Sequence, residues 1–282
     1  MESVKPRSER ILDRLDKETA IFFDIGLIDS AVSTNELIKD AIRTKAGSEG
    51  RLVVALQQSG GYGRQGRHWS SPPGGIYFSL LLHPLTSGRK LQEIPTLGLV
   101  FSLAVRAALA HLGSQQPISV KWPNDVVCSQ GKLCGISLEL VEEALCLGVG
   151  LNLFRPIAEE ALEGKSTPAY AGEVVRENNL PQSVFPQGIS TDQASFYEDV
   201  LAAVLSELRS RYSTWLEEGF SPFRDEYRAH HVLEGQQVRL VSQTNGILNE
   251  GVVQDLDTEG RLCLLDAKGV LFRANSGEVH LV

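Results

Sequence analysis

The chain has 282 residues, of which 42% are hydrophobic and 22% charged, and its formal net charge is −8 at pH 7. This composition is that of a globular protein with a sizeable core, and it excludes disordered and fibrous chains. The acidic balance argues against broad non-specific binding to nucleic acid or to an anionic membrane, because such proteins carry a positive field.

The N-terminal segment contains no apolar stretch of the kind found in secretory signals, so we expect a cytoplasmic protein. The longest apolar run, 97–112, is interrupted by Arg106 and His111 and is too short to span a bilayer. It predicts a core helix over about Leu91–Leu112. The cysteines lack C-x-x-C spacing, so we expect reduced, buried thiols, with a zinc site or disulfide as the alternative.

Helix and strand signals alternate without the strict rhythm of a doubly wound sheet, which predicts an α+β core with a mixed sheet. The run Ser33-Thr34-Asn35-Glu36 predicts a capping box that opens a helix. Residues 155–190 predict a long loop, and an amphipathic helix is expected over about Asp192–Glu217. The expected strands of this region are Arg51–Gln57, Ile76–Leu82, Ile118–Trp122, Val126–Cys128, Leu133–Val141 and Leu145–Leu153.

The sequence changes character after Leu233, where short alternating segments are separated by Asn-Gly, Glu-Gly, Lys-Gly and Ser-Gly turns. This pattern predicts a small β-barrel. We therefore expect a first domain over 1–233, including an N-terminal extension at 1–24 and the loop at 155–190, and a second domain over 234–282. The expected barrel strands are Gln237–Ser242, Gly246–Asp255, Arg261–Asp266, Val270–Ala274 and Glu278–Leu281.

The stretch Gln58–Trp69, QSGGYGRQGRHW, places four glycines and two arginines in twelve residues. Glycines expose backbone N–H groups to an anion, and arginines supply forked charged donors. The stretch predicts a phosphate-binding loop, with a flexible surface loop as the alternative. It also spells G-x-G-x-x-G, but the strand-like run Ile76–Leu82 follows instead of a helix, which argues against a dinucleotide-binding fold.

A second block, Lys121–Gly135, reads KWPNDVVCSQGKLCG and places two lysines around a Trp-Pro-Asn-Asp turn. Without the rest of the block, Lys132 in Gln-Gly-Lys would predict a solvated lysine in a hairpin turn. The Trp-Pro-Asn-Asp run is compatible with a turn that only fixes a strand pair.

With both blocks in hand, the chain resembles the biotin–protein ligases, also called biotin–acetyl-CoA-carboxylase ligases or holocarboxylase synthetases. The resemblance rests on Ser-Thr-Asn, the glycine-rich loop, K-W-P-N-D with K-L-x-G-I, and G-x-G-x-N, which lie here at Ser33–Asn35, Gln58–Trp69, Lys121–Ile136 and Gly148–Asn152. It covers about 25–153, and the barrel in outline through Gly277-Glu278-Val279. Two departures are Tyr62, where the family usually has Arg or Lys, and Val32, where an Asp often stands.

The resemblance implies a class II synthetase-like catalytic core and an SH3-like C-terminal barrel, in the enzyme-only class without an N-terminal DNA-binding domain. It implies that ATP activates biotin to biotinyl-5′-AMP, and that biotin then passes to a lysine of the biotin carboxyl carrier protein of acetyl-CoA carboxylase. Mg²⁺ is expected on the phosphates, with no metal ligand assigned. We expect a monomer or homodimer without nucleic-acid or membrane partners.

Two alternatives remain. A lipoate or octanoate ligase shares the fold and the acyl-adenylate chemistry, but its usual R-R-x-S-G-G-G and H-D-x-G-N signatures are absent from this sequence. A non-catalytic biotin or nucleotide sensor would not need the cations Arg64, Arg67 and Lys132.

The resemblance also implies residue roles. The expected catalytic residues are Lys132 and Arg64. The expected biotin-binding residues are Ser33, Thr34, Asn35, Gln58, Tyr62, Gly63, Arg64, Lys132 and Gly135. The expected ATP- and adenylate-binding residues are Arg64, Arg67, Trp69, Lys132 and Asn152, with supporting roles for Lys121, Asn124 and Asp125.

Overall fold

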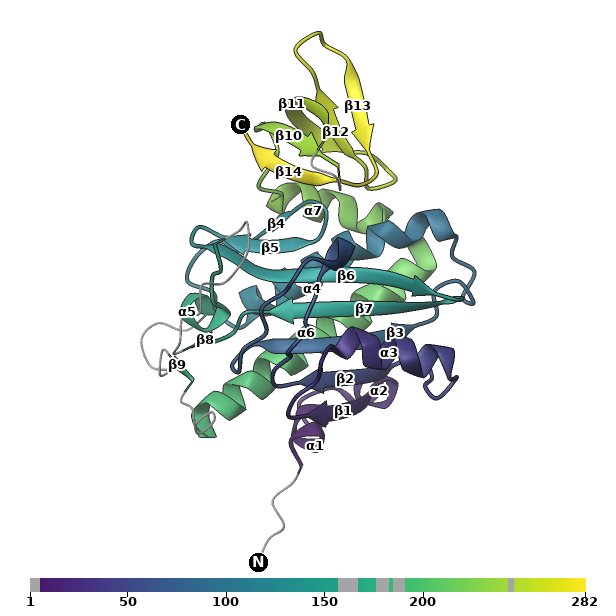
Figure 1. The fold of residues 1–282 in the computed structure, drawn as a ribbon, viewed down its shortest axis with the longest axis vertical. Coiled ribbons are helices and arrows are strands. Elements are labelled where there is room, and N and C mark those ends of the chain that lie inside the picture. The colour runs from purple at the N-terminus through teal and green to yellow at the C-terminus, as the bar shows by residue number, and fades with distance from the viewer. Residues whose placement is uncertain (1–5, 157–166, 176–182, 185–190, 243–245) are drawn as a thin grey trace, which may run out of the picture.

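The computed structural model describes residues 6–156, 167–175, 183–184, 191–242 and 246–282. Its central element is a seven-stranded sheet in the order β1-β2-β3-β7-β6-β5-β4, in which β1 and β2 are parallel and the other neighbouring pairs antiparallel (Figure 1). The sheet confirms the expected mixed α+β core. Its strands are β1 Asp24–Ile28, β2 Arg51–Ala55, β3 Ile76–Leu82, β4 Ser119–Lys121, β5 Asp125–Cys128, β6 Gly131–Val141 and β7 Ala144–Leu151.

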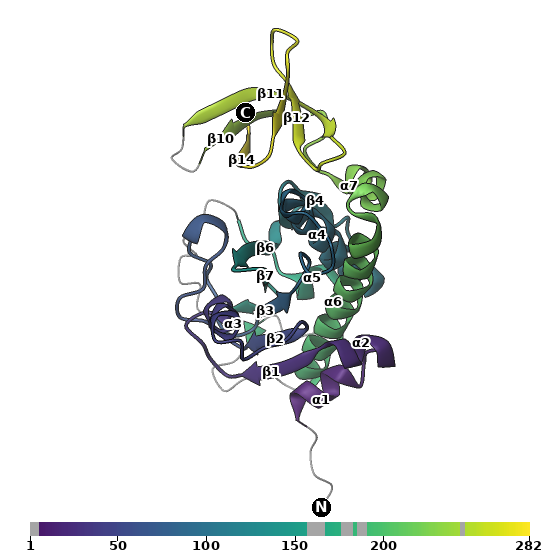
Figure 2. The ribbon, with the colours of Figure 1, turned by 90° about the vertical axis from the view of Figure 1, so that its right-hand side faces the viewer.

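Helices cover the two faces of this sheet unequally. The long helices α4 (Ile94–His111) and α6 (Thr191–Glu218) pack on one face, and α3 (Thr34–Arg43) lies on the other (Figure 2). The face under α3 is therefore only partly covered by a helix, which leaves room for a site. The shorter helices are α1 Arg7–Leu12, α2 Lys17–Phe22, α5 Ala171–Val175 and α7 Arg224–His230.

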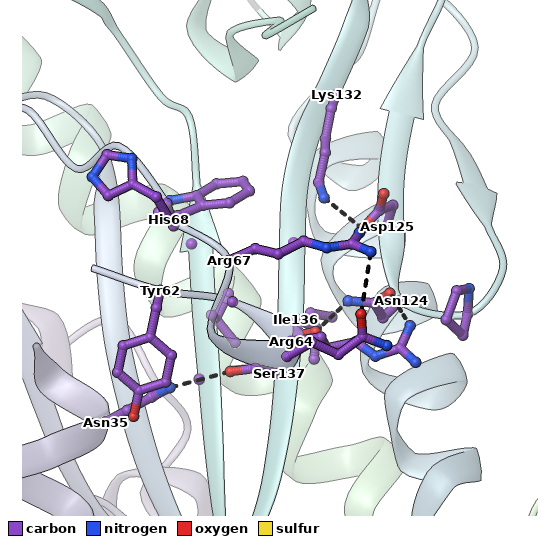
Figure 3. Close-up of a pocket in the computed structure, with 18 of the residues that line it drawn as sticks. Asn35, Tyr62, Arg64, Arg67, His68, Asn124, Asp125, Lys132, Ile136 and Ser137 are labelled. Carbon is purple, nitrogen blue, oxygen red and sulfur yellow. Dashed lines mark hydrogen bonds and ion pairs between the residues drawn. The ribbon is translucent and has the colours of Figure 1, made fainter. Parts of the chain in front are cut away.

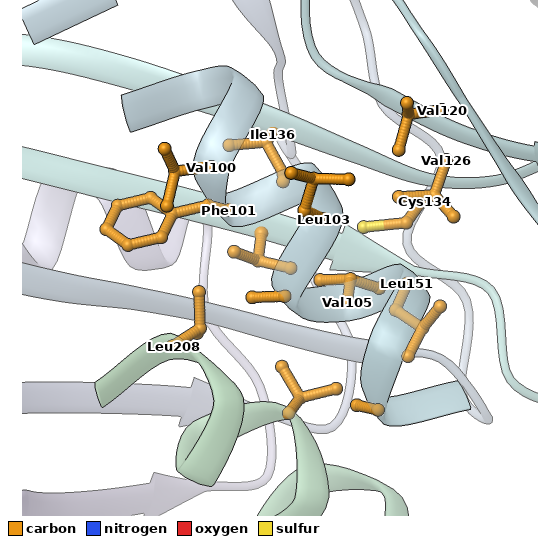
Figure 4. Packing of buried hydrophobic residues seen from close by; sticks show 14 of the residues in the cluster. Val100, Phe101, Leu103, Val105, Val120, Val126, Cys134, Ile136, Leu151 and Leu208 are labelled. Carbon is orange, nitrogen blue, oxygen red and sulfur yellow. The ribbon is translucent and has the colours of Figure 1, made fainter. Parts of the chain in front are cut away.

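The main core lies between the sheet and α4. Leu103 and Val105 of α4 are fully buried, and Ile136 and Leu151 of the sheet pack in the same cluster (Figure 4). The segment Leu91–His111 is long and apolar enough to cross a membrane, but 78% of its apolar window is buried inside the fold. That burial confirms the prediction of a core helix. A smaller cluster under α3 joins Ile38, Ile42, Val53, Leu81, Ala144 and Cys146.

The C-terminal strands form a separate five-stranded antiparallel sheet in the order β13-β12-β11-β10-β14. The Trp122 indole donates to the Gly260 carbonyl across the two parts (3.1 Å), and Arg224 of α7 bonds both Asp255 and Leu256. The second sheet therefore rests against the strand that enters the Trp-Pro-Asn-Asp turn. Its strands are β10 Gln237–Val241, β11 Ile247–Leu256, β12 Leu262–Leu265, β13 Leu271–Ala274 and β14 Glu278–Leu281.

Two sequence-based predictions of local structure were wrong where the structure describes the chain, and residues 157–166, 176–182 and 185–190 of the expected loop lie outside the described ranges. Ser33 occupies the N-cap of α3 but its side chain makes no cap hydrogen bond, so the expected capping box does not form. The expected loop at 155–190 contains α5, whose Ala171 and Val174 are fully buried, and a short parallel pair of β8 (Arg155–Pro156) with β9 (Ser183–Val184). The expected N-terminal extension at 1–24 contains α1 and α2, which pack against α6. The four cysteines are free thiols, and Cys128 alone of them is only half-buried.

His231, at the end of α7, predicts an acid-sensitive stability. Its side chain is 8% exposed, its Nε2 accepts from the Trp122 backbone N–H (3.3 Å), and burial lowers its pKa to about 4. Between pH 6.5 and pH 4, His231 is protonated in the unfolded chain but remains neutral in the folded chain. The free energy of unfolding therefore decreases as the pH falls from 6.5 to 4. We expect a loss of about 3 kcal/mol over that window.

Urea denaturation of wild type and His231→Gln between pH 7 and pH 4.5 checks this expectation. Glutamine retains an acceptor for Trp122 N–H but does not titrate, so the variant should lose less stability on acidification than the wild type. Parallel pH profiles of the two proteins would show that His231 is not responsible.

Candidate functional site

A cavity of about 640 Å³ opens on the face of the sheet that α3 leaves uncovered (Figure 3). Its size is typical of sites for small molecules. The glycine-rich loop Gln58–Trp69, the Trp122–Asp125 turn, the middle of β6 and β7, and the start of β14 all border it. Segments far apart in the sequence therefore contribute to one pocket.

A buried polar network forms one end of the cavity. The Asn35 amide is held at both ends, because Ser79 Oγ donates to its Oδ1 (2.6 Å) while its Nδ2 donates to Ser137 Oγ (3.3 Å) and Glu139 Oε1 (3.1 Å). Ser79 Oγ also lies 2.8 Å from Thr34 Oγ1. An ionised carboxylate can only accept, so Glu139 fixes which end of the Asn35 amide faces it, and the hydroxyl groups of Ser79 and Ser137 adapt to that orientation.

Gln58 connects this network to the loop. Its Oε1 accepts from the Thr34 backbone N–H (2.8 Å), and its Nε2 donates to Ser71 Oγ (2.9 Å). The backbone N–H of Trp69 donates to the Gly61 carbonyl (2.9 Å), which closes the stem of the loop. A Cβ on Gly61 would lie 2.5 Å from Ser71 Oγ and 2.7 Å from the Trp69 carbonyl, so the stem requires glycine there.

The tip of the loop is a tight turn. The Gly63 N–H donates to the Arg67 carbonyl (2.8 Å), and the chain passes through left-handed conformations at Gln65 (φ 63°) and Gly66 (φ 70°). Gly66 adopts the left-handed conformation without steric cost. The same conformation is uncommon for a residue with a side chain, such as Gln65. This turn directs Arg64 toward the cavity.

Three cations of the site each contact a group of the protein. Lys132 Nζ pairs with Asp125 Oδ1 (2.7 Å), Arg64 Nη1 donates to Asn124 Oδ1 (3.1 Å), and Arg67 pairs with Glu278 of β14 (2.6 Å). Burial lowers the pKa of Arg64, an effect that the nearby Asp125 carboxylate opposes. A guanidinium remains charged under such a shift, so the cavity holds concentrated positive charge in an acidic protein.

The Trp69 indole lies against two glycines that face each other across β6 and β7. A Cβ on Gly135 would lie 2.9 Å from the ring, and a Cβ on Gly150 would lie 2.5 Å from Nε1. Lys132 Nζ lies 5.2 Å from the ring centroid. The indole N–H is buried and has no hydrogen-bond partner among the described residues. The ring therefore forms a flat apolar wall with an unused donor.

Gly150→Ala tests this wall. The added methyl group must displace the indole, because the ring is a rigid group 2.5 Å away. We expect the KM for a substrate that packs on this wall to rise about tenfold, which corresponds to about 1.4 kcal/mol. Steady-state kinetics and the change in tryptophan emission relative to wild type check the expectation, and an unchanged KM with a shifted emission would contradict the role of the ring.

All fifteen residues singled out in the sequence line the cavity. Their roles stay predictions. Asn152 is oriented differently from the rest, because its Nδ2 donates to the Lys132 carbonyl (3.0 Å) and so fixes the beginning of β6. Sequence reasoning gave no site role to several lining or network residues, although Gly148 and Glu278 lie in motifs that it noted; these residues are Ser79, Ser137, Gly148, Pro168, Glu278 and His280.

Pro168 lies in the segment that was expected to be irregular. The backbone of 167–169 pairs with Lys132, whose N–H donates to the Thr167 carbonyl and whose carbonyl accepts from the Ala169 N–H (both 2.8 Å). The segment therefore holds the strand that carries Lys132.

No group of three or more His, Cys, Asp or Glu side chains suited to hold a metal ion occurs within the ranges that the structure describes.

Comparisons with known proteins agree with this geometry. Residues 27–152 match the model of the "Biotin/lipoate A/B protein ligase family", and residues 235–282 match the "Biotin protein ligase C terminal domain". The biotin–[acetyl-CoA-carboxylase] ligase of Mycobacterium tuberculosis is 28% identical over 98% of this chain and 96% of its own length. The bifunctional ligase/repressor BirA of Escherichia coli is 27% identical over 97% of this chain and 77% of its own length.

A solved structure of the biotin protein ligase from Aquifex aeolicus, in complex with biotin and ATP, superimposes with a TM-score of 0.73. It is 27% identical and covers 92% of this chain and 98% of the Aquifex chain. The matched regions together span more than half of the sequence and include both sheets. The chain belongs to the biotin protein ligase family.

Proposed function

We propose that the protein is an ATP-dependent biotin–protein ligase. It joins biotin to ATP as biotinyl-5′-AMP with release of pyrophosphate, and then transfers the biotinyl group to a lysine of a biotin carboxyl carrier protein. The observation that carries the proposal is the union, in one cavity, of a fixed polar network at Thr34 and Asn35 with the cations Arg64, Arg67 and Lys132.

The polar network suits the ureido ring of biotin. That ring has a carbonyl acceptor and two N–H donors, which need complementary partners in an otherwise apolar pocket. We assign this task to Ser33, Thr34, Asn35 and Gln58, oriented by the buried Ser79. Removal of a partner would leave a buried polar group unsatisfied, and that loss gives selectivity for a ureido ring.

The first chemical step requires two negatively charged groups to meet. The biotin carboxylate oxygen attacks the α-phosphorus of ATP, the P–O bond to the β-phosphate breaks, and pyrophosphate leaves. We assign Lys132 to the charge that develops between the carboxylate and the α-phosphate, and Arg64 and Arg67 to the phosphates. Phosphates would then replace Asp125, Asn124 and Glu278 as partners of these cations.

The second step needs no nucleophile from the enzyme. The neutral amine of the acceptor lysine attacks the acyl carbon, AMP leaves, and the amine loses a proton as the amide forms. The enzyme must mainly align the reactants and exclude water, which would hydrolyse the mixed anhydride. The loop 58–69 lies over the cavity and suits this task.

Magnesium is proposed as the companion of ATP. The phosphates and water would hold the ion, because Mg²⁺ retains several waters and needs few protein ligands. A cytoplasmic location and a monomeric or homodimeric state are likewise proposals.

The exchange of labelled pyrophosphate into ATP tests the function, with biotin, lipoate and octanoate supplied separately. We expect exchange when biotin is supplied and none with lipoate or octanoate. Biotin should then be transferred to a carrier domain. Exchange with lipoate but not with biotin would replace the proposal by a lipoate ligase, and exchange with none of the acids would favour a sensor.

A further inference from the structure

Tyr62, the residue that departs from the family pattern, links the glycine-rich loop to α3. Its hydroxyl donates to Glu36 Oε1 at 2.5 Å, a short distance expected for a hydrogen bond to a carboxylate. This contact uses the carboxylate that the sequence pattern assigned to a capping box.

The partner carboxylate belongs to a wider charged network. Lys39 Nζ lies 2.6 Å from Glu36 and 2.9 Å from Glu139, and it lies 5.1 Å from the centroid of the Tyr62 ring. Glu139 in turn accepts from Asn35 Nδ2 (3.1 Å). The loop is therefore connected, through a continuous set of contacts, to the polar end of the cavity.

Both partners of the contact remain in the protonation state that it needs. Burial and the Glu36 carboxylate raise the pKa of Tyr62, so the hydroxyl keeps its proton. Hydrogen bonds from Lys39 and Tyr62 lower the pKa of Glu36, so the carboxylate stays ionised. The contact therefore persists at neutral pH.

Gln58 anchors the base of the loop to α3, and the two other side-chain anchors near the tip, Arg64 and Arg67, differ from Tyr62 in one respect. Arg64 and Arg67 hold Asn124 and Glu278 with the same guanidinium groups that phosphates would attract, so ligand binding competes with those contacts. Tyr62 instead uses a neutral hydroxyl that binds the Glu36 carboxylate on α3, so this contact does not occupy a cation that a phosphate would attract. The Tyr62 contact can thus persist with and without ligand.

We infer that Tyr62 is a positioning residue that latches the loop 58–69 onto α3 before any ligand binds, and that this latch slows the release of biotinyl-5′-AMP. The first half of the inference stands on the contacts of the ligand-free protein. The second half rests on the proposed function, since it requires the adenylate to form.

Hydrogen–deuterium exchange of the ligand-free protein tests the latch itself. Tyr62→Phe removes the hydroxyl and keeps the ring, and it should speed exchange of the amides in 58–69 about tenfold. Tyr212→Phe is the matched control, because Tyr212 donates to Glu49 Oε1 at 2.8 Å outside the residues that line the cavity. The control should leave exchange in 58–69 unchanged. Equal exchange in wild type and Tyr62→Phe would overturn the latch.

A double-variant cycle tests whether Tyr62 acts through Glu36. Glu36→Ala should speed loop exchange as Tyr62→Phe does, and the double variant should add nothing to either single change, because all three lack the same contact. Additive effects of the two substitutions would overturn the pairing.

Retention of the adenylate is measured on purified complexes by the release of labelled biotinyl-5′-AMP. Tyr62→Phe should raise the release rate about tenfold, whereas the control Tyr212→Phe should release the adenylate at the wild-type rate. Faster loop exchange with unchanged release would overturn the role in retention. If the wild type forms no adenylate, the proposed function fails, and the ligand-free exchange measurement still decides the latch.

Discussion

Replacement of Lys132 by methionine is expected to reduce kcat for biotin-dependent pyrophosphate exchange by about 10²- to 10³-fold, which corresponds to about 3–4 kcal/mol of lost transition-state stabilisation. Lys132 Nζ lies in the cavity beside Asp125, and it is the cation assigned to both reacting charges. Methionine retains the length and apolar stem of lysine but not its charge. Exchange kinetics at saturating biotin and ATP, with a urea melt of each protein, measure the effect.

Two controls separate a catalytic role from a structural one. If Lys132 only neutralised Asp125, the double variant Asp125→Asn/Lys132→Met would recover exchange, because no unpaired carboxylate would remain. We expect no recovery. Arg51→Met removes the cation of a 2.6 Å ion pair with Asp24 at the far edge of the sheet, and it should leave exchange intact. Full activity of Lys132→Met would rule out its assigned role.

The second large effect is expected from Gly148→Ala. A Cβ at this position would overlap Asn35 Oδ1 and lie 2.5 Å from Ser137 Oγ, and both atoms belong to the buried polar network. The methyl group must push the Asn35 amide out of its only satisfied orientation. The loss of about 2 kcal/mol of hydrogen bonding predicts a rise in the KM for biotin of about 30-fold, with a smaller change in the KM for ATP.

Gly98→Ala provides the comparison for that experiment. Gly98 is a buried glycine of α4, and its added Cβ would lie 3.6 Å from Leu138, an ordinary van der Waals distance. It should not change the KM for biotin. Isothermal titration with biotin alone separates binding from turnover, and equal biotin affinity in Gly148→Ala and wild type would contradict the assigned role of Asn35.

The elements that could be predicted from the sequence are those whose local pattern matches their surroundings. Strand β3 was predicted residue for residue, because all of Ile76–Leu82 is buried and a continuous apolar run is the signature of such a strand. Helix α6 was predicted to within one residue at each end, since its buried residues recur at helical spacing. The glycine-rich loop was found because backbone access to an anion requires glycine.

The elements that were missed depend on contacts that are distant in the sequence. Helix α1 has six residues and one buried side chain, Ile11, and a helix of that length is stabilised by packing rather than by its own pattern. Its Arg10 pairs with the buried Glu198 of α6 at 2.6 Å. The capping-box prediction failed for the same reason, because Glu36 has a stronger partner in Tyr62, 26 residues away.

The site was predicted for its charged and glycine-rich residues and missed for its buried hydroxyl groups. Ser79 is the single polar residue in the apolar run Ile76–Leu82, and that interruption was a signal that could have identified it. Ser137 and Glu278 offered weaker signals, because serine on a strand and glutamate in a turn are common on protein surfaces. Ser137 and Glu278 belong to the site because the fold brings β6 and β14 beside the loop 58–69.

Gly135, Gly148 and Gly150 lie on one face of adjacent strands, opposite Trp69 and Asn35. The pocket therefore depends on three positions that carry no side chain, and no substitution at these positions can make more room on the sheet side. A bulkier acid can gain space on the opposite wall if Trp69 is replaced by a shorter residue, because Asn35 is needed for the polar network. Analogues that carry their extra atoms toward the sheet should be rejected, whereas extensions toward the indole can be matched by one substitution.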